Sequence, residues 1–342
     1  MIKVLVVDDS AFMRSAISRM LEKDSEIQVV GVAKNGQEAV ERVEALRPDV
    51  VTLDIEMPIM NGIEALKQIM SKYRLPVIMF SALTKEGADI TMEALNIGAS
   101  DFITKDFSNV SLNISTRENE LINKVKSVAK NKITLLLKRF ELDRKPVAFN
   151  TDKSTRHKML AIGASTGGPP ALQNILTRFP KDFPVPVVIA QHMPKLFTQS
   201  FAQRLNAASQ IEVKEAENGE TLRSGTALVA PGDTHISLKR RGNDVTIEFV
   251  NDTKYIYRPS VDLLMSAAAN MYGPQTVGLI LTGMGNDGLA GVKEIKSRNG
   301  YIIAQDEETS VVYGMPKAVV NANMADAVLP IDKIPEEIIK IL

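Results

Sequence analysis

Ser165 is the residue of this chain whose surroundings most resemble those of a nucleophile. It lies in a Gly-x-Ser-x-Gly pattern (Gly163, Ser165, Gly167), which is typical of a sharp strand-to-helix turn that exposes a hydroxyl. A serine hydroxyl also needs a base within hydrogen-bond reach and a carboxylate that orients the base. The pattern alone fits a helix cap or a phosphate-binding turn as well.

The base has to come from three histidines, His157, His192 and His235. His192 follows the apolar run "VPVVIAQ" and reaches the same rim as Ser165 if both runs are parallel strands. His157 lies in a basic stretch between two domains, and His235 follows "APGD", where we expect a turn residue. His192 is therefore the predicted base.

The orienting carboxylate has three candidates. Asp287 lies just past the apolar run "TVGLILT", in a glycine-rich turn. Asp233 neighbours His235 rather than His192, and Asp262 lies in "RPSVDLLM", where it can serve the start of a helix. Asp287 is the predicted residue, and the two others remain competitors.

The turn around Asp287 also contains a pattern of another protein class. Gly283, Gly285 and Gly288 spell Gly-x-Gly-x-x-Gly after a strand, and Asp306 follows eighteen residues later, as a dinucleotide site requires. Asp287 argues against this rival, because a carboxylate inside the turn would repel a pyrophosphate. The fingerprint also belongs at the start of its domain, whereas here it lies near the end.

A second group of reactive side chains lies at strand ends in the first third of the chain. Asp8 and Asp9 follow "VLVV", and Asp54 follows "VVTL". In an open parallel sheet these ends share one crevice, where three carboxylates repel one another unless a divalent cation such as Mg²⁺ lies between them. Ser81 and Lys105 end two further strands and add a hydroxyl and a cation. Together these groups could bind a phosphoryl group and its metal.

The elements that position both groups follow an alternating βα pattern. In residues 1–129, the runs "IKVLVVDD", "IQVVGVA", "VVTLD", "PVIMFSA" and "DFITK" alternate with segments of helical period and predict five βα units. A second series in residues 158–342 runs from "MLAIGAS" to "DAVLP", with a hairpin around "KRRGND". The predicted fold class is α/β, with two doubly wound parallel-sheet domains. Residues 130–157 lie in a basic stretch that reads as a solvated linker or as a contact for an acidic partner.

Composition excludes several classes of protein. The 342 residues suit two domains, and 41 basic against 41 acidic residues give no net charge to attract nucleic acid. No apolar run approaches the roughly 18 residues of a membrane span, and no signal peptide is apparent, which favours a cytoplasmic protein without membrane insertion. The absence of cysteine excludes disulfides and thiolate metal sites.

The first domain resembles the receiver domain of two-component response regulators, in "VDDSAFMR", "LDIEMPIMNGIEAL", "FSAL" and "FITK". The resemblance implies a flavodoxin-like fold and these roles: Asp54 as phosphoacceptor; Asp8, Asp9, Asp54 and the backbone carbonyl of Glu56 as Mg²⁺ ligands; Ser81 and Lys105 as phosphoryl-binding groups. One departure is Asp106, which stands where receivers usually carry proline and places a negative charge near the phosphoryl site.

The second domain resembles the chemotaxis protein-glutamate methylesterase (CheB) family from about residue 159 to the end. The segments that carry the resemblance are "IGASTGGPPAL", "AQHMPKLFTQSFAQRL", "VAPGDTH", "YRPSVDLL", "ILTGMGNDG" and "VVYGMPKAV". The resemblance implies a catalytic triad of Ser165, His192 and Asp287. It also implies that backbone N–H groups near Met284 hold the oxyanion and that Thr166 lies beside the nucleophile.

By this resemblance the chain is a phosphorylation-regulated serine hydrolase. Its substrates would be glutamate γ-methyl esters of methyl-accepting chemotaxis receptors, with methanol as product and receptor glutamines as deamidation sites. A chemotaxis histidine kinase would be the phosphodonor, with Mg²⁺ needed in the receiver domain and no cofactor in the esterase. The unphosphorylated receiver would limit access to the catalytic rim. The alternative is a response regulator whose second domain only binds a partner.

Overall fold

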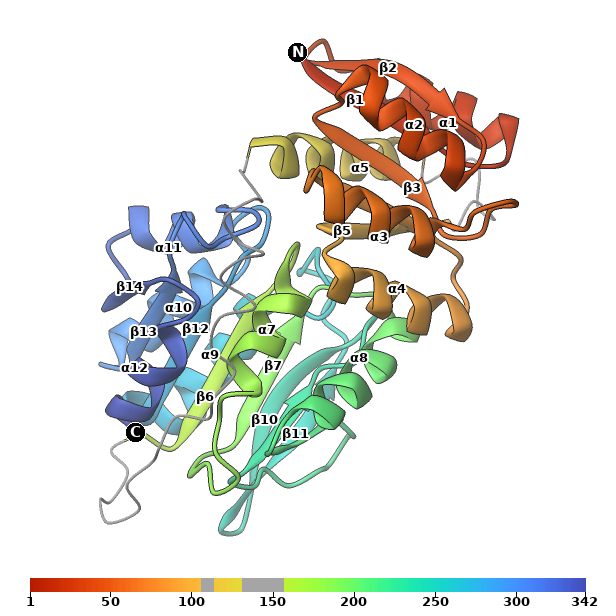
Figure 1. The fold of residues 1–342 in the computed structure, drawn as a ribbon. Coiled ribbons are helices and arrows are strands. Elements are labelled where there is room, and N and C mark those ends of the chain that lie inside the picture. The colour runs from red at the N-terminus through yellow and green to blue at the C-terminus, as the bar shows by residue number, and fades with distance from the viewer. Residues whose placement is uncertain (106–113, 131–156) are drawn as a thin grey trace. The chain divides into compact units, whose positions relative to one another are not determined.

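The computed structural model describes residues 1–105, 114–130 and 157–342 (Figure 1). These residues form two compact units, one on each side of segment 131–156. Asp106 and all but the ends of the basic linker lie outside the described residues. The expectations for them, and the domain limits at residues 129 and 158, remain predictions.

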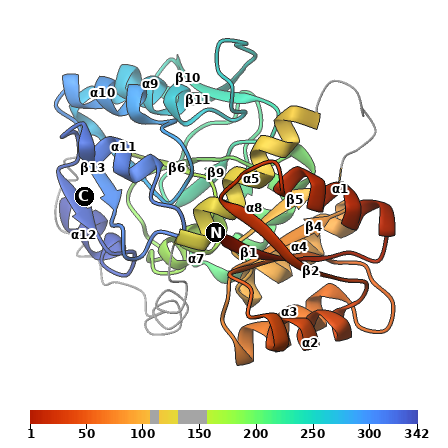
Figure 2. The same ribbon diagram turned by 90° about the horizontal axis from the view of Figure 1, so that it is seen from above.

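The first unit alternates strands with helices along the chain. Its elements are β1 (Ile2–Val7), α1 (Ala11–Leu21), β2 (Ile27–Ala33), α2 (Gly36–Leu46), β3 (Val50–Asp54), α3 (Gly62–Lys72), β4 (Val77–Ser81), α4 (Lys85–Ile97), β5 (Asp101–Thr104) and α5 (Ile114–Lys130). The five strands form one parallel sheet in the order β2-β1-β3-β4-β5. Helices α1 and α5 cover one face, and α2 to α4 cover the other (Figure 2). The strand order reverses between β1 and β3, where such sheets bind ligands.

Local sequence explains where the helices of this unit begin. The residue before each of the first four helices has a side chain that accepts a hydrogen bond from a backbone N–H of the first turn: Ser10, Asn35, Asn61 and Thr84. Such caps satisfy donors that have no partner inside the helix. Strands β3 and β4 are buried at every residue, as expected for central parallel strands covered on both faces.

The second unit is a larger α/β domain with the following elements: β6 (Met159–Ala164), α7 (Gly168–Leu176), β7 (Val187–Gln191), α8 (Lys195–Ala208), β8 (Glu212–Glu215), β9 (Thr226–Val229), β10 (His235–Arg241), β11 (Asp244–Val250), α9 (Val261–Tyr272), a 3₁₀ turn (Gly273–Gln275), β12 (Thr276–Ile280), α10 (Leu289–Ser297), β13 (Tyr301–Gln305), α11 (Met315–Asn321), β14 (Ala327–Leu329) and α12 (Ile334–Ile341). Seven strands form a parallel sheet in the order β14-β13-β12-β6-β7-β9-β8.

Two parallel sheets with helices confirm the predicted fold class. The predicted hairpin is also present, since β10 and β11 pair in antiparallel register around Gly242. The sequence did not predict β8, an edge strand with the sequence Glu-Val-Lys-Glu, in which only Val213 is buried. It therefore has no apolar run that sequence analysis could detect.

The carboxyl edge of the second sheet is supported by one large hydrophobic cluster. Inward-facing residues of β6 and β7 pack there against α9, α10, α11 and the β10–β11 hairpin. Strand β6 is buried at all six residues, so its carboxyl end is fixed from both faces. A loop leaving this strand therefore starts from a rigid platform.

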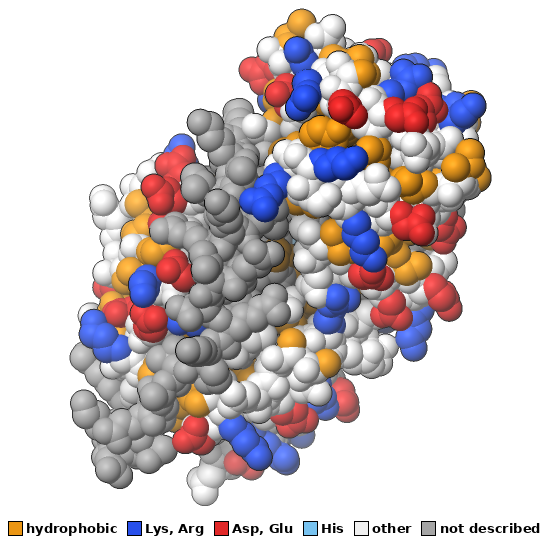
Figure 3. Space-filling view, viewed as in Figure 1, with side chains coloured by type: hydrophobic (Ala, Val, Ile, Leu, Met, Phe, Trp, Pro, Cys, Tyr) orange, Lys and Arg blue, Asp and Glu red, His pale blue; other side chains and the backbone are white. Residues whose placement is uncertain are grey.

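The visible surface carries positive and negative side chains interspersed over both units (Figure 3). This distribution agrees with the balanced composition of the chain. Within the described residues, every helix is too short or too polar to cross a membrane.

Candidate functional site

Ser165 lies directly after β6, at the carboxyl edge of the second sheet. Its backbone N–H donates to the carbonyl of Thr282, 3.0 Å away, and its own carbonyl accepts from the N–H of Gly168 at 2.8 Å. Gly167 has φ +76°, a left-handed conformation that side chains rarely adopt, and α7 begins at the next residue. The serine is partly exposed on a tight strand-to-helix turn, as the Gly-x-Ser-x-Gly pattern predicted.

Gly163 lets a second element approach the same strand. A Cβ at this position would lie 2.1 Å from Cγ1 of Val261, the first residue of α9. The N-terminus of α9 therefore rests on β6 two residues before Ser165. The first glycine of the pattern thus brings a helix N-terminus beside the nucleophile.

His192 lies directly after β7, next to β6 in the sheet. Its backbone N–H donates to the carbonyl of Ala164 at 3.0 Å. The buried side chain of Gln191 donates from Nε2 to the carbonyls of both Ser165 and His192, each 3.0 Å away. The two turns are thereby tied together, which confirms that His192 and Ser165 share one rim.

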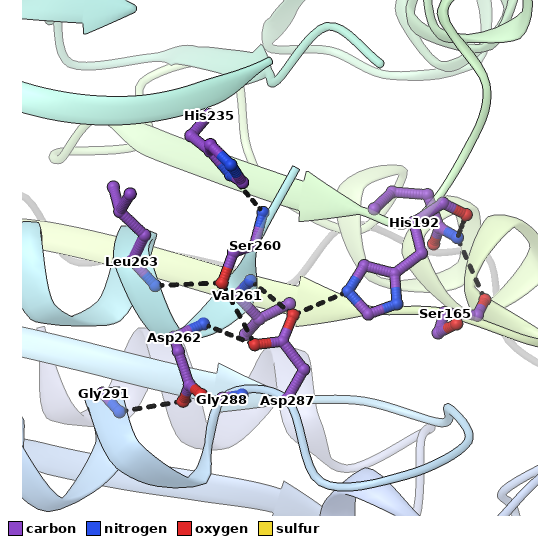
Figure 4. Close-up of polar contacts among 11 residues, drawn as sticks. Ser165, His192, His235, Ser260, Val261, Asp262, Leu263, Asp287, Gly288 and Gly291 are labelled. Carbon is purple, nitrogen blue, oxygen red and sulfur yellow. Dashed lines mark hydrogen bonds and ion pairs between the residues drawn. The ribbon is translucent and has the colours of Figure 1, made fainter. Parts of the chain in front are cut away.

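Asp287 meets His192 at this rim (Figure 4). The Asp287 Oδ2 lies 2.8 Å from His192 Nε2 and also accepts from the N–H of Val261 at 2.8 Å. Its Oδ1 accepts from the N–H of Asp262 at 3.0 Å and from Ser260 Oγ at 3.2 Å. Burial raises the pKa of Asp287, but the hydrogen bonds from His192 and from the start of α9 outweigh it and hold the pKa below its ordinary value.

The orientation of the imidazole assigns a role to each ring nitrogen. With Nε2 donating to Asp287, Nδ1 lies on the side of Ser165 (Figure 4). Within the described residues, no hydrogen bond joins this ring to the Ser165 hydroxyl. Hydrogen bonds of this kind are often long without substrate and tighten in the reacting complex.

Asp262 does not contact the base. Its Oδ1 accepts from the N–H groups of Gly288 at 2.9 Å and Gly291 at 3.0 Å, at the start of α10. Burial and the nearby charge of Asp287 raise the pKa of Asp262. Asp262 therefore serves a helix start, as the sequence suggested, but the helix is α10 rather than its own. Asp287 is the acid that meets His192.

His235 has a structural role that sequence analysis did not find. The expected turn residue is fully buried at the start of β10, where Nδ1 accepts from the N–H of Ser260 at 3.1 Å and Nε2 faces the carbonyl of Asp252 at 3.2 Å. Burial lowers the pKa of His235, so the neutral ring is favoured. The ring fixes the residue that precedes α9. Asp233, the third candidate acid, lies before β10 with φ +64°, in the turn that leads to His235.

The same contacts argue against a dinucleotide site. A pyrophosphate would need the N–H groups at the start of α10, and the Asp262 carboxylate accepts from two of them. Asp287, inside the turn, adds a second negative charge. The Gly-x-Gly-x-x-Gly pattern is here part of a loop that presents a carboxylate.

The predicted oxyanion group lies on this loop. Met284 lies two residues after Thr282, whose carbonyl accepts from the N–H of Ser165. Among the turn and loop hydrogen bonds of the described residues, none is donated by the N–H of Met284. Thr166 is buried beside Ser165, and its carbonyl accepts from Thr282 Oγ1 at 2.9 Å.

Tyr257 is a further residue at the site that sequence analysis missed. Its ring stacks on the imidazole of His192, with centroids 4.5 Å apart and planes inclined by 11°. Tyr257 lies in the loop between β11 and α9, shortly before α9 begins at Val261. Its only signal was its place at the head of the segment "YRPSVDLL", which does not identify its partner.

The acidic residues of the first unit also come together. Ligand oxygens of Asp8, Asp9 and Asp54 lie within 4.8 Å of one another. The Lys105 ammonium lies 2.8 Å from Asp8 Oδ2 and 2.6 Å from Asp54 Oδ2. Glu56 lies two residues beyond Asp54, on an exposed part of the β3–α3 loop.

Burial dominates the electrostatics of this cluster. It raises the pKa of Asp54 to about 6, although the Lys105 ammonium opposes the shift. Burial lowers the pKa of Lys105, but Asp54 and Asp8 outweigh it and hold that pKa above its ordinary value. Burial of this cluster therefore disfavours the ionised form of Asp54, and the Lys105 ammonium offsets that effect only in part.

The donor set fits a hard divalent cation. All three acidic side chains offer oxygen, and Oδ2 of Asp8 is buried without a hydrogen bond in the described residues, with only the Lys105 ion pair beside it. Ser81 ends β4 at the same sheet edge, but its hydroxyl is engaged elsewhere: its Oγ accepts from Thr91 Oγ1 at 2.7 Å and donates to the carbonyl of Gly87 at 3.2 Å.

Comparisons with known proteins match the two parts of the chain to two families. Residues 160–338 match the model of the CheB methylesterase family, and residues 4–117 match that of the response regulator receiver domain. A protein-glutamate methylesterase/protein-glutamine glutaminase of Pyrococcus horikoshii is 48% identical over 99% of this chain and 93% of its own length. The protein of that name from Thermotoga maritima is 46% identical over 100% of this chain and 98% of its own. The crystal structure of the Thermotoga maritima CheB methylesterase catalytic domain matches with a TM-score of 0.53 and 45% identity, over 54% of this chain and 99% of that one.

Proposed function

The chain belongs to the CheB methylesterase family and carries a response regulator receiver domain, and from this premise we propose that it is a phosphorylation-regulated protein-glutamate methylesterase. Its substrates are then γ-methyl esters of glutamate in methyl-accepting chemotaxis receptors. Receptor glutamines are a second substrate, because an amide can follow the same path with ammonia as the leaving group.

The observation that carries the proposal is the Asp287–His192 pair beside Ser165. The 2.8 Å contact gives the imidazole an orienting acid, and the ring presents its other nitrogen on the side of the serine. This arrangement supports nucleophilic catalysis rather than a helix cap.

The reaction follows from these positions. Nδ1 of His192 takes the hydroxyl proton while Ser165 Oγ attacks the ester carbonyl, and Asp287 stabilises the imidazolium. The tetrahedral oxyanion accepts hydrogen bonds from backbone N–H groups near Met284. The C–O bond to the methoxy group breaks, and methanol leaves with the proton from His192. Water then attacks the acyl-enzyme by the same route and frees the glutamate.

The first unit supplies the regulation. We propose Asp54 as the phosphoacceptor, with Asp8, Asp9, Asp54 and the carbonyl of Glu56 as the groups that would hold Mg²⁺. When bound, the cation offsets the charge that develops on the phosphoryl oxygens. Lys105 lies 2.6 Å from Asp54 and can bind a phosphoryl oxygen, and Ser81 can do so once its hydroxyl leaves Gly87. The donor would be a chemotaxis histidine kinase, in the cytoplasm.

Methanol release from methyl-labelled receptor membranes tests the proposal. The wild-type chain should release methanol, and Ser165→Ala and His192→Ala should each lower turnover by more than about 10⁴-fold without unfolding the chain. A wild-type chain that binds receptors but releases no methanol would favour a partner-binding output domain. Wild-type turnover in either variant would remove that residue from the mechanism.

A further inference from the structure

Asp262 is a carboxylate next to the site that the proposed reaction does not use. It lies in the first turn of α9, yet its Oδ1 accepts from the N–H groups of Gly288 and Gly291, at 2.9 and 3.0 Å. These donors belong to the start of α10. The side chain therefore caps a neighbouring helix.

Asp287 makes the reverse contact. It immediately precedes Gly288, the N-cap of α10, and its two oxygens accept from the N–H groups of Val261 and Asp262 in the first turn of α9. Each of the two carboxylates thus caps the helix to which the other belongs or which the other precedes. Each satisfies donors that have no partner inside their own helix, and each meets the positive end of a helix dipole.

This exchange constrains Asp287 from two sides. The start of α9 holds its carboxylate, while Asp262 holds the backbone of Gly288, the next residue along the chain. The carboxylate is buried and has to stay 2.8 Å from His192 Nε2. A displacement of about 1 Å in such a constellation can reduce turnover about 100-fold.

We propose that Asp262 is a positioning residue for the Asp287–His192 pair, because its carboxylate fixes the turn from which Asp287 reaches the base. This inference rests on the proposed serine hydrolase function. It assigns Asp262 no contact with substrate and no proton to transfer.

Steady-state kinetics of the full-length chain distinguish a positioning role of Asp262 from a catalytic one. We expect Asp262→Ala to lower kcat for methanol release by about 10- to 100-fold, with KM within about threefold of wild type. Asp262→Asn should remain within about fivefold of wild type, because its amide oxygen can accept from the same two N–H groups.

Asp326→Ala is the matched control. Asp326 also accepts from a backbone N–H, that of Ile302, at 2.7 Å, and pairs with Lys296, but it lies at the opposite end of the sheet. This variant should lose thermal stability while its kcat stays at the wild-type value.

The proton between His192 and Asp287 gives a readout that does not depend on activity. With three histidines in the chain, imidazole ¹⁵N labelling and NMR can observe the Nε2–H of His192, and His192→Gln identifies its signal. The far-downfield resonance expected for wild type should persist in Asp262→Asn and Asp326→Ala. It should shift upfield or broaden in Asp262→Ala.

The outcomes distinguish this inference from the proposed function. A wild-type chain without esterase activity would overturn the function, and the NMR comparison would still test whether Asp262 holds the pair. Asp262→Ala with wild-type kcat and an unchanged resonance would overturn the positioning role, as would an Asp262→Asn loss as large as that of alanine. If Asp262→Ala does not fold, Asp262→Ser replaces it under the same criteria, because the serine side chain is one atom shorter than that of aspartate.

Discussion

At the residue scale, the two nitrogens of His192 face different residues. Nε2 meets the acid and Nδ1 lies on the side of the serine, so the imidazole must keep its proton on Nε2 to accept one from Ser165. The Asp287 carboxylate enforces this tautomer, because an ionised carboxylate can only accept hydrogen bonds.

Asp287→Asn should therefore lower turnover by roughly 10⁴-fold. An amide NH₂ facing Nε2 would favour the tautomer whose proton lies on Nδ1, and the serine would lose its base. Either orientation also turns the NH₂ toward a backbone N–H of α9, that of Val261 when it faces Nε2 and that of Asp262 when it is reversed, at a cost of about 1–3 kcal/mol in stability. Methanol release and thermal unfolding measured on the same samples check both effects. A benign Asp287→Asn would mean that another group orients the base.

Asp54→Asn should stabilise the metal-free first unit, and more so at pH 8 than at pH 5. The folded pKa of Asp54, about 6, lies above its unfolded value near 3.8, so stability falls as the pH rises from about 4 through 6 and stays lower above that. At about 1.4 kcal/mol per pKa unit, the gain at pH 8 is at most about 3 kcal/mol. Calorimetry in EDTA measures this gain in stability. The transition of the first unit is identified beforehand as the one whose midpoint temperature Mg²⁺ raises in the wild-type chain. An equal gain at both pH values would contradict the burial argument.

The types and spacing of residues predicted the three proposed catalytic side chains better than the residues that position them. Ser165 and His192 directly follow apolar runs and Asp287 follows one after a glycine-rich turn, so the strand order brings all three to one edge. The roles of His235 and Tyr257 depend on a loop that folds back over the edge, and no periodic pattern describes such a loop. Asp262 was recognised as a residue of a helix start, but only the packing of α9 against α10 shows which helix it serves.

At the element scale, the site depends on how closely α9 approaches β6. Val261 packs on the bare backbone of Gly163, and this contact places the first turn of α9 under the Asp287 carboxylate. The two glycines around Ser165 therefore have different tasks, one in packing and one in the turn.

Gly163→Ala should lower both stability and turnover, because its Cβ would lie 2.1 Å from Val261 Cγ1 and push the start of α9 away. We expect a loss of about 1–3 kcal/mol in the free energy of unfolding. The double variant Gly163→Ala/Val261→Ala removes the clashing methyl group and should recover part of both losses. A double-mutant cycle in unfolding and kcat measures the coupling, and strict additivity would contradict this account.

Sequence patterns also predicted most elements of both sheets. Apolar β-branched runs located the central strands, because these strands are buried on both faces. The edge strand β8 was missed for the opposite reason, since it buries a single side chain. The pattern of apolar residues does not determine how closely the start of a helix approaches a neighbouring strand. The catalytic geometry depends on that approach.

At the scale of the whole molecule, one chain carries a phosphoacceptor site and an esterase site. A phosphoryl group adds roughly two negative charges at Asp54, beside Lys105. We expect the unphosphorylated first unit to restrain the esterase. A full shift from 1:99 to 99:1 in active population would require about 5.5 kcal/mol of differential interaction, and a smaller bias gives weaker activation.

Deleting residues 1–145 should therefore raise basal methylesterase activity. A small-molecule phosphodonor should raise the activity of the full-length chain, and Asp54→Ala should abolish that response without lowering basal activity. Methanol release from the three proteins, with and without donor, measures these effects. A truncated enzyme no faster than the unphosphorylated full-length chain would exclude restraint and leave direct stimulation as the explanation.

The two activities should also differ in their need for metal. EDTA should block phosphorylation of Asp54, because its three carboxylates require a cation to accept a phosphodonor. The fragment from about residue 150 onward should hydrolyse esters equally well with chelator, since its proposed triad uses side chains alone. Esterase activity that disappears in EDTA and returns with Zn²⁺ or Mg²⁺ would indicate a metallohydrolase.

The strand order of the second sheet has a consequence for how this enzyme becomes active during its synthesis. Strands β6, β7 and β12 are neighbours at the centre of the sheet, but β12 is made more than 80 residues after β7. A chain still emerging from the ribosome carries the nucleophile and base without their acid, and it cannot close the centre of the sheet until the late strand arrives. Such distant pairings form slowly. Partly made or C-terminally clipped chains should therefore be inert toward receptors, and on dilution from denaturant esterase activity should return with the slowest folding phase.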